Sequence, residues 1–531
     1  MSALRSYDQI GEGGSGASIE VPKSFQPDGD TVLINSDSRL FEYPASVSTF
    51  SPSGVSQIII PQHRSRYILG GTSYLQFRVL IDVNQCIMGP PPANGVTYTP
   101  AIYFTGGPTK SAAALIDRIT VSASNGQVLA DVTNYAQWHN LILCHASNED
   151  YTRNASISEC AFTAAVSGTT LSNGPGGSNV VVSFNGTVDV SLPLALNLFQ
   201  ESKAFPLWAL NGPLIIVIQW ASQLRSLSVA PMPYMNSADL ETRDGNLIDC
   251  ISAVGITYSG SELTYRCRCV DVDTDYIQQQ RAMMMAGKVL TYNYRQVQGL
   301  IVKPAVTGIS FNFGVNCSSL LAVFGATMMD KDCDTRASSV ASGAAGTGTW
   351  TLGTNPNNKG SWGFSSNSQQ NVRVYRDGTQ LSTFALNRSG RDDTFIPLME
   401  AFGVLFSTTN SSAAKRCLSQ NPILQSVNSV IDTARTYQGP QGAHIVQNFS
   451  SPLAFSYGNL DGGSVYAPNT YAWGLSARMC NDAEIINKGS ACSQLQITVD
   501  SMASAAATTY IFYAYACSIS FDASGNVMVR R

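Results

Sequence analysis

The sequence predicts an all-β protein made of two consecutive halves. From Thr31 onward, apolar and polar residues alternate along many short segments, which is the period of β-strands. Turn-forming Gly, Asn, Ser and Pro residues separate these segments. The length of 531 residues exceeds what one core of ordinary size needs. Each half of about 250 residues ends in a strand-like segment rich in Tyr, which indicates an internal duplication.

The chain carries unusually few charges. Charged residues make up 13% of it, about half of the roughly 25% usual in soluble proteins. This number of charged side chains is too small to keep a large free surface hydrated. We therefore expect partner subunits to bury much of that surface, as in an obligate oligomer. The formal net charge is −4, and residues 1–30 carry only Arg5 and Lys23 as bases. Direct, sequence-specific binding of nucleic acid is therefore not expected.

The N-terminal segment and the cysteines carry little functional signal. Residues 1–30 are rich in Gly and Ser without apolar periodicity, so we expect a flexible N-terminal arm. We find no apolar leader and no run of about 18 apolar residues, which predicts a soluble chain that is not conventionally secreted. The twelve cysteines form no CxxC unit, and we interpret them as reduced, buried hydrophobic side chains.

Three segments of the first half predict defined elements. Strict alternation over residues 75–83 predicts a half-buried antiparallel strand. Asn125-Gly126, typical of two-residue hairpin turns, separates two alternating runs and predicts a β-hairpin. Helical spacing of apolar residues within 134–144, including Tyr135 and Trp138, predicts a short packing helix.

The middle of the chain predicts a loop, further strands and a boundary. Residues 165–178, rich in Gly, Ser and Thr, predict a loop before two more strand-like runs. In residues 263–277 the apolar phase slips between Cys269 and Val270, which predicts a bulge or a sharp bend. Residues 277–287 predict a short helix that ends at its last residue, a Gly, and links the two halves.

The second half repeats this outline. Strands are expected at 299–313 and 317–328, followed by an exposed loop at 330–372 dominated by Ser, Gly, Asn and Thr. Apolar spacing over 427–434 predicts an amphipathic helix. A turn at Ser524-Gly525 between aromatic and β-branched runs predicts a C-terminal hairpin.

Titratable residues that would support enzyme chemistry are scarce. General acid or base catalysis needs groups that titrate near neutral pH, and the chain has only four histidines without metal-ligand spacing. We interpret all four as structural: His63, His139, His145 and His444.

Three other patterns have simpler interpretations than binding sites. Asp271, Asp273 and Asp275 could suggest Ca²⁺ on one strand face, but no turn Gly or bidentate Glu follows, so a solvated or intersubunit face is favoured. GEGGSG at 11–16 lacks the preceding strand and following Lys of a phosphate loop. Met283–Met285 are expected to pack partly into the core. We therefore predict no catalytic, cofactor-binding or metal-binding residue, no cofactor and no enzyme activity.

Several segments resemble the double jelly-roll major capsid proteins of the lineage that includes adenovirus hexon, virophage and polinton-like virus capsids. The order of these segments carries the resemblance, and most of it lies in the first half. The matching segments are IIIPQHRSRYILGGTSYLQFRV, ALIDRITVSASNGQVLADVTNYAQWHNLI, VSLPLALNLFQESKAFPLWALNGPLIIVIQW and ELTYRCRCVDVDTDYIQQQ.

The resemblance implies two consecutive eight-stranded jelly-roll barrels with short helices and long loops. The expected divisions are an N-terminal arm (1–30), a first jelly roll (31–276), a linker helix (277–287) and a second jelly roll (288–531). Three subunits would form a pseudo-hexagonal homotrimeric capsomer in the icosahedral shell of a DNA virus.

On the same model the long loops project outward, and the arm lies on the inner side near neighbouring capsomers or an internal membrane. Partners would be copies of the chain itself, together with penton and minor capsid proteins.

Two other functions fit parts of the sequence. A single jelly-roll capsid protein with an added domain is one, although such coat proteins for RNA genomes usually carry basic arms. A β-rich cell-surface or carbohydrate-binding protein is the other, and low charge with abundant Thr and Asn would suit it. The scarcity of Glu and the lack of an export signal weigh against a carbohydrate-active enzyme.

Overall fold

The structure is a computed structural model, and its described part is mostly β-sheet. It describes residues 36–88, 101–104, 112–146, 165–173, 180–200, 204–222, 227–230, 250–303, 307–329, 364, 369, 371–387, 394–403, 471–477, 489–502, 505 and 507–531.

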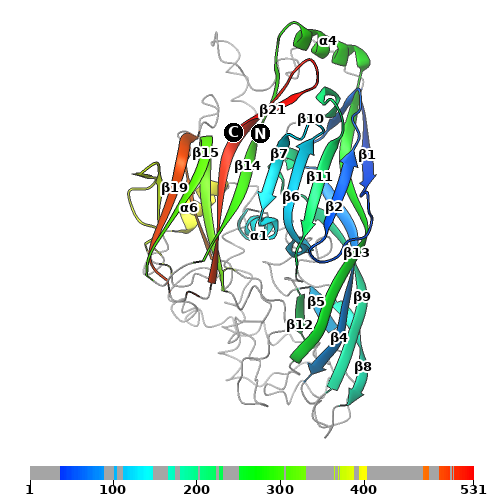
Figure 1. Cartoon of the computed structure of the whole chain (residues 1–531), viewed down its shortest axis with the longest axis vertical. Helices are drawn as coiled ribbons and strands as arrows, with labels where there is room; N and C mark the ends of the chain where they lie inside the picture. Colours follow the sequence, from blue (N-terminus) through cyan, green and yellow to red (C-terminus); the bar gives the residue numbers. More distant parts are fainter. Residues whose placement is uncertain are drawn as a thin grey trace, which may run out of the picture.

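A four-stranded antiparallel sheet forms one layer of the first half (Figure 1). Its strands, in spatial order, are β2 (Val55–Ile60), β11 (Leu214–Trp220), β6 (Ile116–Ala123) and β7 (Val128–Thr133). The predicted hairpin between β6 and β7 is confirmed. Its turn is longer than the two-residue turn we expected, because the N–H of Ala123 bonds to the carbonyl of Gln127 and Gly126 takes the positive φ of 80°.

A larger sheet forms the second layer. Its order is β10-β3-β13-β4-β9-β8-β5-β12, and β1 pairs with β13 outside this path. The strand predicted at 75–83 lies within β4, and its described inward side chains Leu75, Phe77 and Val79 are buried. The strands are β1 (Ser36–Pro44), β3 (Arg66–Ile68), β4 (Tyr74–Met88), β5 (Ala101–Phe104), β8 (Ala165–Asn173), β9 (Val180–Pro193), β10 (Phe205–Pro206), β12 (Leu227–Ala230) and β13 (Cys250–Val272).

Stacked aromatic rings fill the space between these two layers. Phe50 lies flat on Trp220 of β11, with ring centroids 3.6 Å apart, and Phe77 of β4 meets both rings edge-on. Phe50 also exchanges backbone hydrogen bonds with Gly260 of β13. A Cβ at Gly260 would lie 1.8 Å from the Phe50 ring, so only Gly permits this close approach.

The second half forms an eight-stranded sheet of order β14-β20-β15-β19-β16-β17, with β18 on β15 and β21 on β20. The predicted C-terminal hairpin is confirmed as β20 and β21, and Gly525 occupies its turn at φ 78°. The strands are β14 (Leu290–Val302), β15 (Thr307–Met329), β16 (Arg373–Arg376), β17 (Thr379–Gln380), β18 (Ala472–Ser476), β19 (Ser490–Ser501), β20 (Ala507–Phe521) and β21 (Val527–Arg530).

Short helices connect or cover the sheets. The predicted packing helix is α1, and α4 lies between the last strand of the first half and β14. Asp273 caps α4 by accepting the N–H of Asp275, and Gly287 ends its last turn with φ 87°. The helices are α1 (Tyr135–His145), α3 (Asn197–Gln200), α4 (Thr274–Met285) and α6 (Phe395–Phe402), with 3₁₀ turns η3 (Ala112–Leu115) and η4 (Leu207–Ala209). No helix in the described ranges is long and apolar enough to span a membrane.

The predicted bulge between Cys269 and Val270 is wrong. Strands β1 and β3 both pair with β13 in continuous register through these residues. Asp271 keeps the inward phase because Arg66 binds its carboxylate with two hydrogen bonds of 2.8 Å. The register of β13 breaks earlier, where Glu262 has a positive φ of 57°.

Other predicted boundaries also need correction. The segment expected to be a loop at 165–178 contains strand β8, and the strands expected at 299–313 and 317–328 are the end of β14 and one long β15. Within 330–372, the described side chains of Phe364, Gln369 and Val372 are buried, and the exposed loop stays a prediction. Residues 1–30 and the helix predicted at 427–434 lie outside the described residues, and the division into domains stays a prediction.

Substituting Gly260→Ala should destabilise the first half, because the new Cβ would displace Phe50 from Trp220. We expect a loss of about 1–3 kcal/mol in the free energy of unfolding, measured by urea titration followed by Trp fluorescence. Gly314→Ala is the matched control, since Gly314 is also in a strand but has nothing within 4 Å of an added Cβ. Equal losses in the two variants would contradict this account of the core.

Candidate functional site at the junction of the two halves

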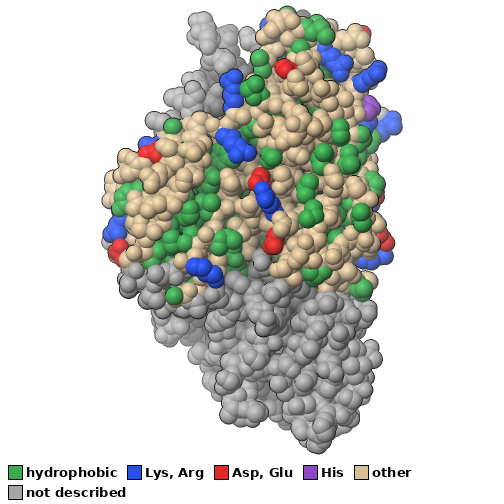
Figure 2. Space-filling model, in the orientation of Figure 1, with side chains coloured by type: hydrophobic (Ala, Val, Ile, Leu, Met, Phe, Trp, Pro, Cys, Tyr) green, Lys and Arg blue, Asp and Glu red, His purple; other side chains and the backbone are tan. Residues whose placement is uncertain are grey.

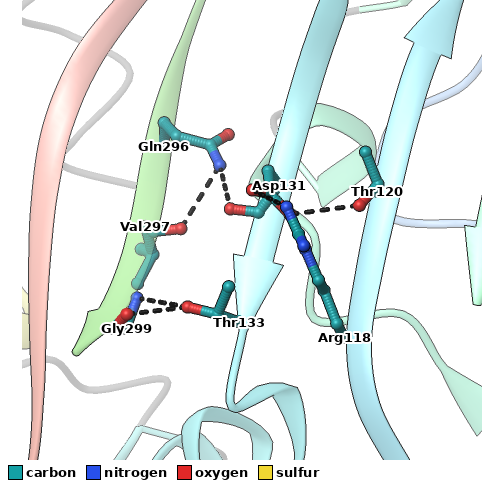
Figure 3. A network of polar contacts seen from close by, with 7 residues as sticks. All are labelled: Arg118, Thr120, Asp131, Thr133, Gln296, Val297 and Gly299. Atoms are coloured by element: carbon teal, nitrogen blue, oxygen red, sulfur yellow. Dashed lines mark hydrogen bonds and ion pairs between the residues drawn. The ribbon is translucent and has the colours of Figure 1, made fainter. Parts of the chain in front are cut away.

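The edges of two sheets meet between the halves. Strand β7 is an edge strand of the four-stranded sheet, and β14 is the edge strand of the eight-stranded sheet beside it (Figures 1 and 3). The Gln296 amide of β14 donates to the carbonyl of Asp131 on β7 at 2.8 Å. The Thr133 hydroxyl donates to the carbonyl of Gly299 at 2.7 Å and accepts the Gly299 N–H at 3.2 Å. Side chains therefore satisfy backbone groups along both edges.

Asp131 belongs to both sides of this junction (Figure 3). Its backbone carbonyl faces Gln296, while its carboxylate receives two hydrogen bonds of 2.7 Å from Arg118 and one of 3.1 Å from Thr120. The carboxylate raises the pKa of the Arg118 guanidinium, mainly through their hydrogen bond. This fork fixes β7 against β6, and so positions the edge that β14 meets.

Gly299 lets the two edges approach closely. A Cβ at this position would lie 2.6 Å from the carbonyl oxygen of Thr133 and 2.9 Å from the ring of Phe512. A larger side chain would push β14 away from β7 and separate the hydrogen-bonding groups.

Two tyrosines of β14 add hydrogen bonds to the first half. The Tyr292 hydroxyl donates to the carbonyl of Leu198 at 2.9 Å, and the Tyr294 hydroxyl donates to the carbonyl of Leu129. Burial raises the pKa of Tyr294 well above its usual value, so this phenol keeps its proton and remains a donor.

The C-terminal hairpin also contacts the first half. Asn211 donates its backbone N–H to the carbonyl of Gly525 at 3.0 Å, and the Asn125 amide donates to the carbonyl of Val527 at 3.3 Å. The turn of the β6–β7 hairpin thus meets strand β21, which joins segments about 400 residues apart in sequence.

Helix α1 supplies the apolar part of the junction. Trp138 of α1 lies 5.4 Å from Phe512 and 5.5 Å from Phe324, both on strands of the eight-stranded sheet, and 6.1 Å from Phe402 of α6. Aromatic pairs at these distances contribute beyond their buried area. The helix is buried on nearly all sides, and its polar residues Gln137, His139, Asn140 and His145 are buried too.

The outer faces of the two first-half sheets differ in character. On the four-stranded sheet, Val55 and Ile59 of β2 are 65% and 44% exposed, and the half-buried Ile215 and Val217 of β11 lie opposite β2 residues. Figure 2 shows hydrophobic side chains on this face, together with a few charged ones near its middle.

The four-stranded sheet also carries the Arg118–Asp131 ion pair on this face, and the larger sheet carries several ion pairs on its outer side. Arg78 contacts Asp189 at 2.7 Å and Glu262 at 3.2 Å, and Arg266 contacts Glu42 at 2.8 Å. Such exposed pairs add little stability but keep a surface hydrated. Of the two faces, the apolar one of the four-stranded sheet is the better candidate for contact with another protein surface.

The residues considered as chemical sites lie apart from one another. His139 and His145 are buried in α1, whereas His63 is near the surface with Nδ1 3.6 Å from Asp271. His444 and the segment 11–16 lie outside the described residues. Asp275 belongs to α4 and not to a strand, which corrects the expectation that three aspartates share one strand face. Across the described ranges, no three His, Cys, Asp or Glu side chains form a metal-binding group.

Of the three consecutive methionines, Met284 is buried and Met285 is exposed, so this segment packs partly into the core, as we expected. The junction was not foreseen from the sequence. One signal was present, because Gln296 falls in phase with Tyr292 and Tyr294, and a polar side chain on a buried face needs a partner.

Thr133→Val should weaken the junction, because Val keeps the shape of Thr but leaves two Gly299 backbone groups without their partner. We expect a loss of roughly 1–3 kcal/mol in the free energy of unfolding, measured by urea titration. Thr120→Val is the control, since Asp131 keeps both Arg118 hydrogen bonds in that variant. A loss in the control as large as in Thr133→Val would contradict the role of Thr133.

His139 should make the fold sensitive to acid. Burial lowers the pKa of His139 to about 4, while an unfolded His titrates near 6.5, so the unfolded chain binds the proton first as the pH falls. The stability that neutral His139 supports is therefore present above about pH 6.5 and is lost towards pH 4, by about 2 kcal/mol between pH 7 and pH 5.

This loss is measured from urea midpoints at the two pH values. His139→Gln should show a smaller difference between pH 7 and pH 5 than the unmodified chain. An unchanged difference in His139→Gln would remove His139 as the cause.

No protein-family model matches the chain, and no curated protein matches its sequence. Among solved structures, the Faustovirus major capsid protein is similar over 100% of this chain and 96% of its own, with a TM-score of 0.51 and 8% identity.

Two further structures are similar with lower scores. PBCV-1 VP54, fitted into a reconstruction of the virophage Sputnik, has a TM-score of 0.47 and 13% identity over 94% of this chain and 97% of its own. The mavirus major capsid protein has a TM-score of 0.39 and 9% identity over 97% and 96%. The similarity to the Faustovirus major capsid protein, which extends over nearly the full length of both chains, shows an all-β fold of the double jelly-roll class, as expected from the sequence.

Proposed function

We propose that this chain is a major capsid protein, a structural subunit of a viral shell. The observation that carries the proposal is the similarity of its fold, over nearly the full length of both chains, to the Faustovirus major capsid protein. A similarity confined to one half would have left room for a single jelly roll with an unrelated added domain. Because both halves are included, the whole subunit fits one shared role.

The composition and the junction support a role based on geometry. A shell subunit needs a fixed shape and surfaces that contact like copies, and it needs no titrating active site. The hydrogen bonds between β7 and β14 and the aromatic contacts of Trp138 favour one arrangement of the halves. The low charge content suits a subunit whose surface is covered by neighbours.

The finer assembly is part of the same proposal. Two eight-stranded barrels per subunit and three subunits per capsomer would form a pseudo-hexagonal homotrimer in the icosahedral shell of a DNA virus. The chain would reside in the virion capsid after assembly in the host cell, and would contact neighbouring capsomers, penton and minor capsid proteins. The long loops would project outward, while the arm at 1–30 would lie inside, near neighbouring capsomers or an internal membrane.

Purified full-length protein tests the proposal directly. Light scattering after size-exclusion chromatography should give the mass of three chains of 56.7 kDa, and negative-stain microscopy should show triangular or pseudo-hexagonal particles. A stable monomer at micromolar concentration would overturn the proposed capsomer.

Charges placed on the apolar face of the four-stranded sheet should weaken association. In the double variant Val55→Asp with Ile59→Asp, each carboxylate would lose hydration on contact, so we expect at least a tenfold weaker trimer. The readout is the mass distribution over a dilution series. Thr187→Asp, an exposed residue on a strand of the larger sheet, is the control and should leave association unchanged. Equal weakening by both would mean that this face is not the specific contact.

A further inference from the structure

Two cysteines face each other across neighbouring strands of the second half. Cys317 of β15 and Cys492 of β19 are direct register partners, and both are free and buried. As direct partners on neighbouring strands, the two side chains lie on the same face of the sheet, and the Cys492 thiol donates to the carbonyl of Gln494 at 3.4 Å. Neither residue has a role in the junction or in the apolar outer face.

The strand register makes this pair suitable for a covalent bond. Opposite residues of antiparallel strands have Cα atoms about 4.5–5.5 Å apart, and disulfides accept about 4.4–6.8 Å. Cys317 and Cys492 are paired, and the register of β15 shifts on both sides of this pair.

A second cysteine pair in the chain provides a contrast. The sulfurs of Cys267 and Cys269 are 3.5 Å apart, but these residues are two positions apart on one strand. Their Cα atoms are therefore about 6.6 Å apart, near the upper limit for a disulfide. A short distance between two sulfurs does not by itself favour a disulfide. The Cα separation expected from the cross-strand register of Cys317 and Cys492 does favour one.

The cover over the cross-strand pair is thin. Asn316, next to Cys317, is exposed and has a positive φ of 45°, and Ser493, next to Cys492, is exposed as well. The Asp377 carboxylate holds the segment after Cys492 by accepting the backbone N–H of Ser493 at 3.0 Å and that of Gln494 at 2.7 Å. The Ser318 N–H also bonds to the carbonyl of Arg531 at 3.3 Å, and local opening of these contacts would expose the thiols.

We propose that Cys317 and Cys492 form a reversible disulfide that fastens β15 to β19 when the folded chain meets a small-molecule disulfide. The Cys317 thiolate attacks one sulfur of that disulfide, forms a mixed disulfide and releases one thiol. The Cys492 thiol loses its proton to solvent and attacks the Cys317 sulfur, which releases the second thiol. The chain loses two hydrogen atoms, and the small disulfide is reduced to two thiols.

The order of attack follows from the environment of the two thiols. The neighbouring Cys492 lowers the pKa of the Cys317 thiol, and the neighbouring Cys317, together with burial, raises the pKa of the Cys492 thiol. Cys317 is therefore the first nucleophile. The bond would close a loop of about 175 residues, and cross-links across long loops restrict the unfolded chain most strongly. This inference does not depend on the capsid role.

Peptide mapping of the unmodified protein tests the bond without any variant. The folded full-length chain is incubated with 2-hydroxyethyl disulfide, free thiols are alkylated, and the protein is digested with trypsin and an Asp-specific protease. Cys317 then lies in peptide 296–329, Cys492 in 489–499 and Cys517 in 500–521. We expect a species joining 296–329 to 489–499 that disappears on reduction. A bond from Cys492 to Cys517, a bond between Cys267 and Cys269 instead, or no bond would overturn the proposal.

Thermal unfolding provides a second readout. Oxidation should raise the Tm of the unmodified chain by about 5 °C or more, and reduction should reverse the rise. Cys317→Ser and Cys492→Ser should each abolish the shift. Cys517→Ser, a buried cysteine of the neighbouring strand β20, is the matched control and should retain it. A shift that persists without Cys317 would also overturn the proposal.

Discussion

The arrangement of the chain depends on how two open sheet edges meet. An edge strand presents unpaired N–H and C=O groups, which attract other strands unless something covers them. Here β7 and β14 cover each other, and side chains rather than a backbone ladder make the contacts. Gln296 reaches the carbonyl of Asp131, and the Thr133 hydroxyl serves both backbone groups of Gly299. The two sheets therefore remain separate layers while their relative position is defined.

Polar and apolar contacts have different roles at this junction. Hydrogen bonds are directional, so they set which residues of β7 and β14 lie opposite each other. The aromatic packing of Trp138 against Phe324 and Phe512 is less directional and stabilises the contact through buried apolar area. The C-terminal hairpin adds contacts at Asn125 and Asn211, far from α1. Contacts at several separate places restrict rotation of one half against the other.

A fixed two-part body suits the proposed shell function. Assembly by symmetry requires that every copy present the same surfaces in the same orientation. The exposed ion pairs of the larger sheet and the exposed Val55 and Ile59 of the four-stranded sheet give the two outer faces different surfaces. The few charged side chains of the chain are thus unevenly distributed over the surface of the first half.

The sequence by itself determined the local elements and the fold class. Alternation defined β4, and turn residues defined the hairpins at Gly126 and Gly525, because strands and turns depend on neighbouring residues. The apolar–polar alternation predicted a bulge at the wrong place in β13. Asp271 points inward like the alternate residues before it, because Arg66, which is distant in sequence, binds its carboxylate. Only the tertiary structure decided the junction, because Gln296 and Asp131 are 165 positions apart. No local sequence pattern indicates a hydrogen bond between residues so far apart, because its two groups come together only when the chain folds.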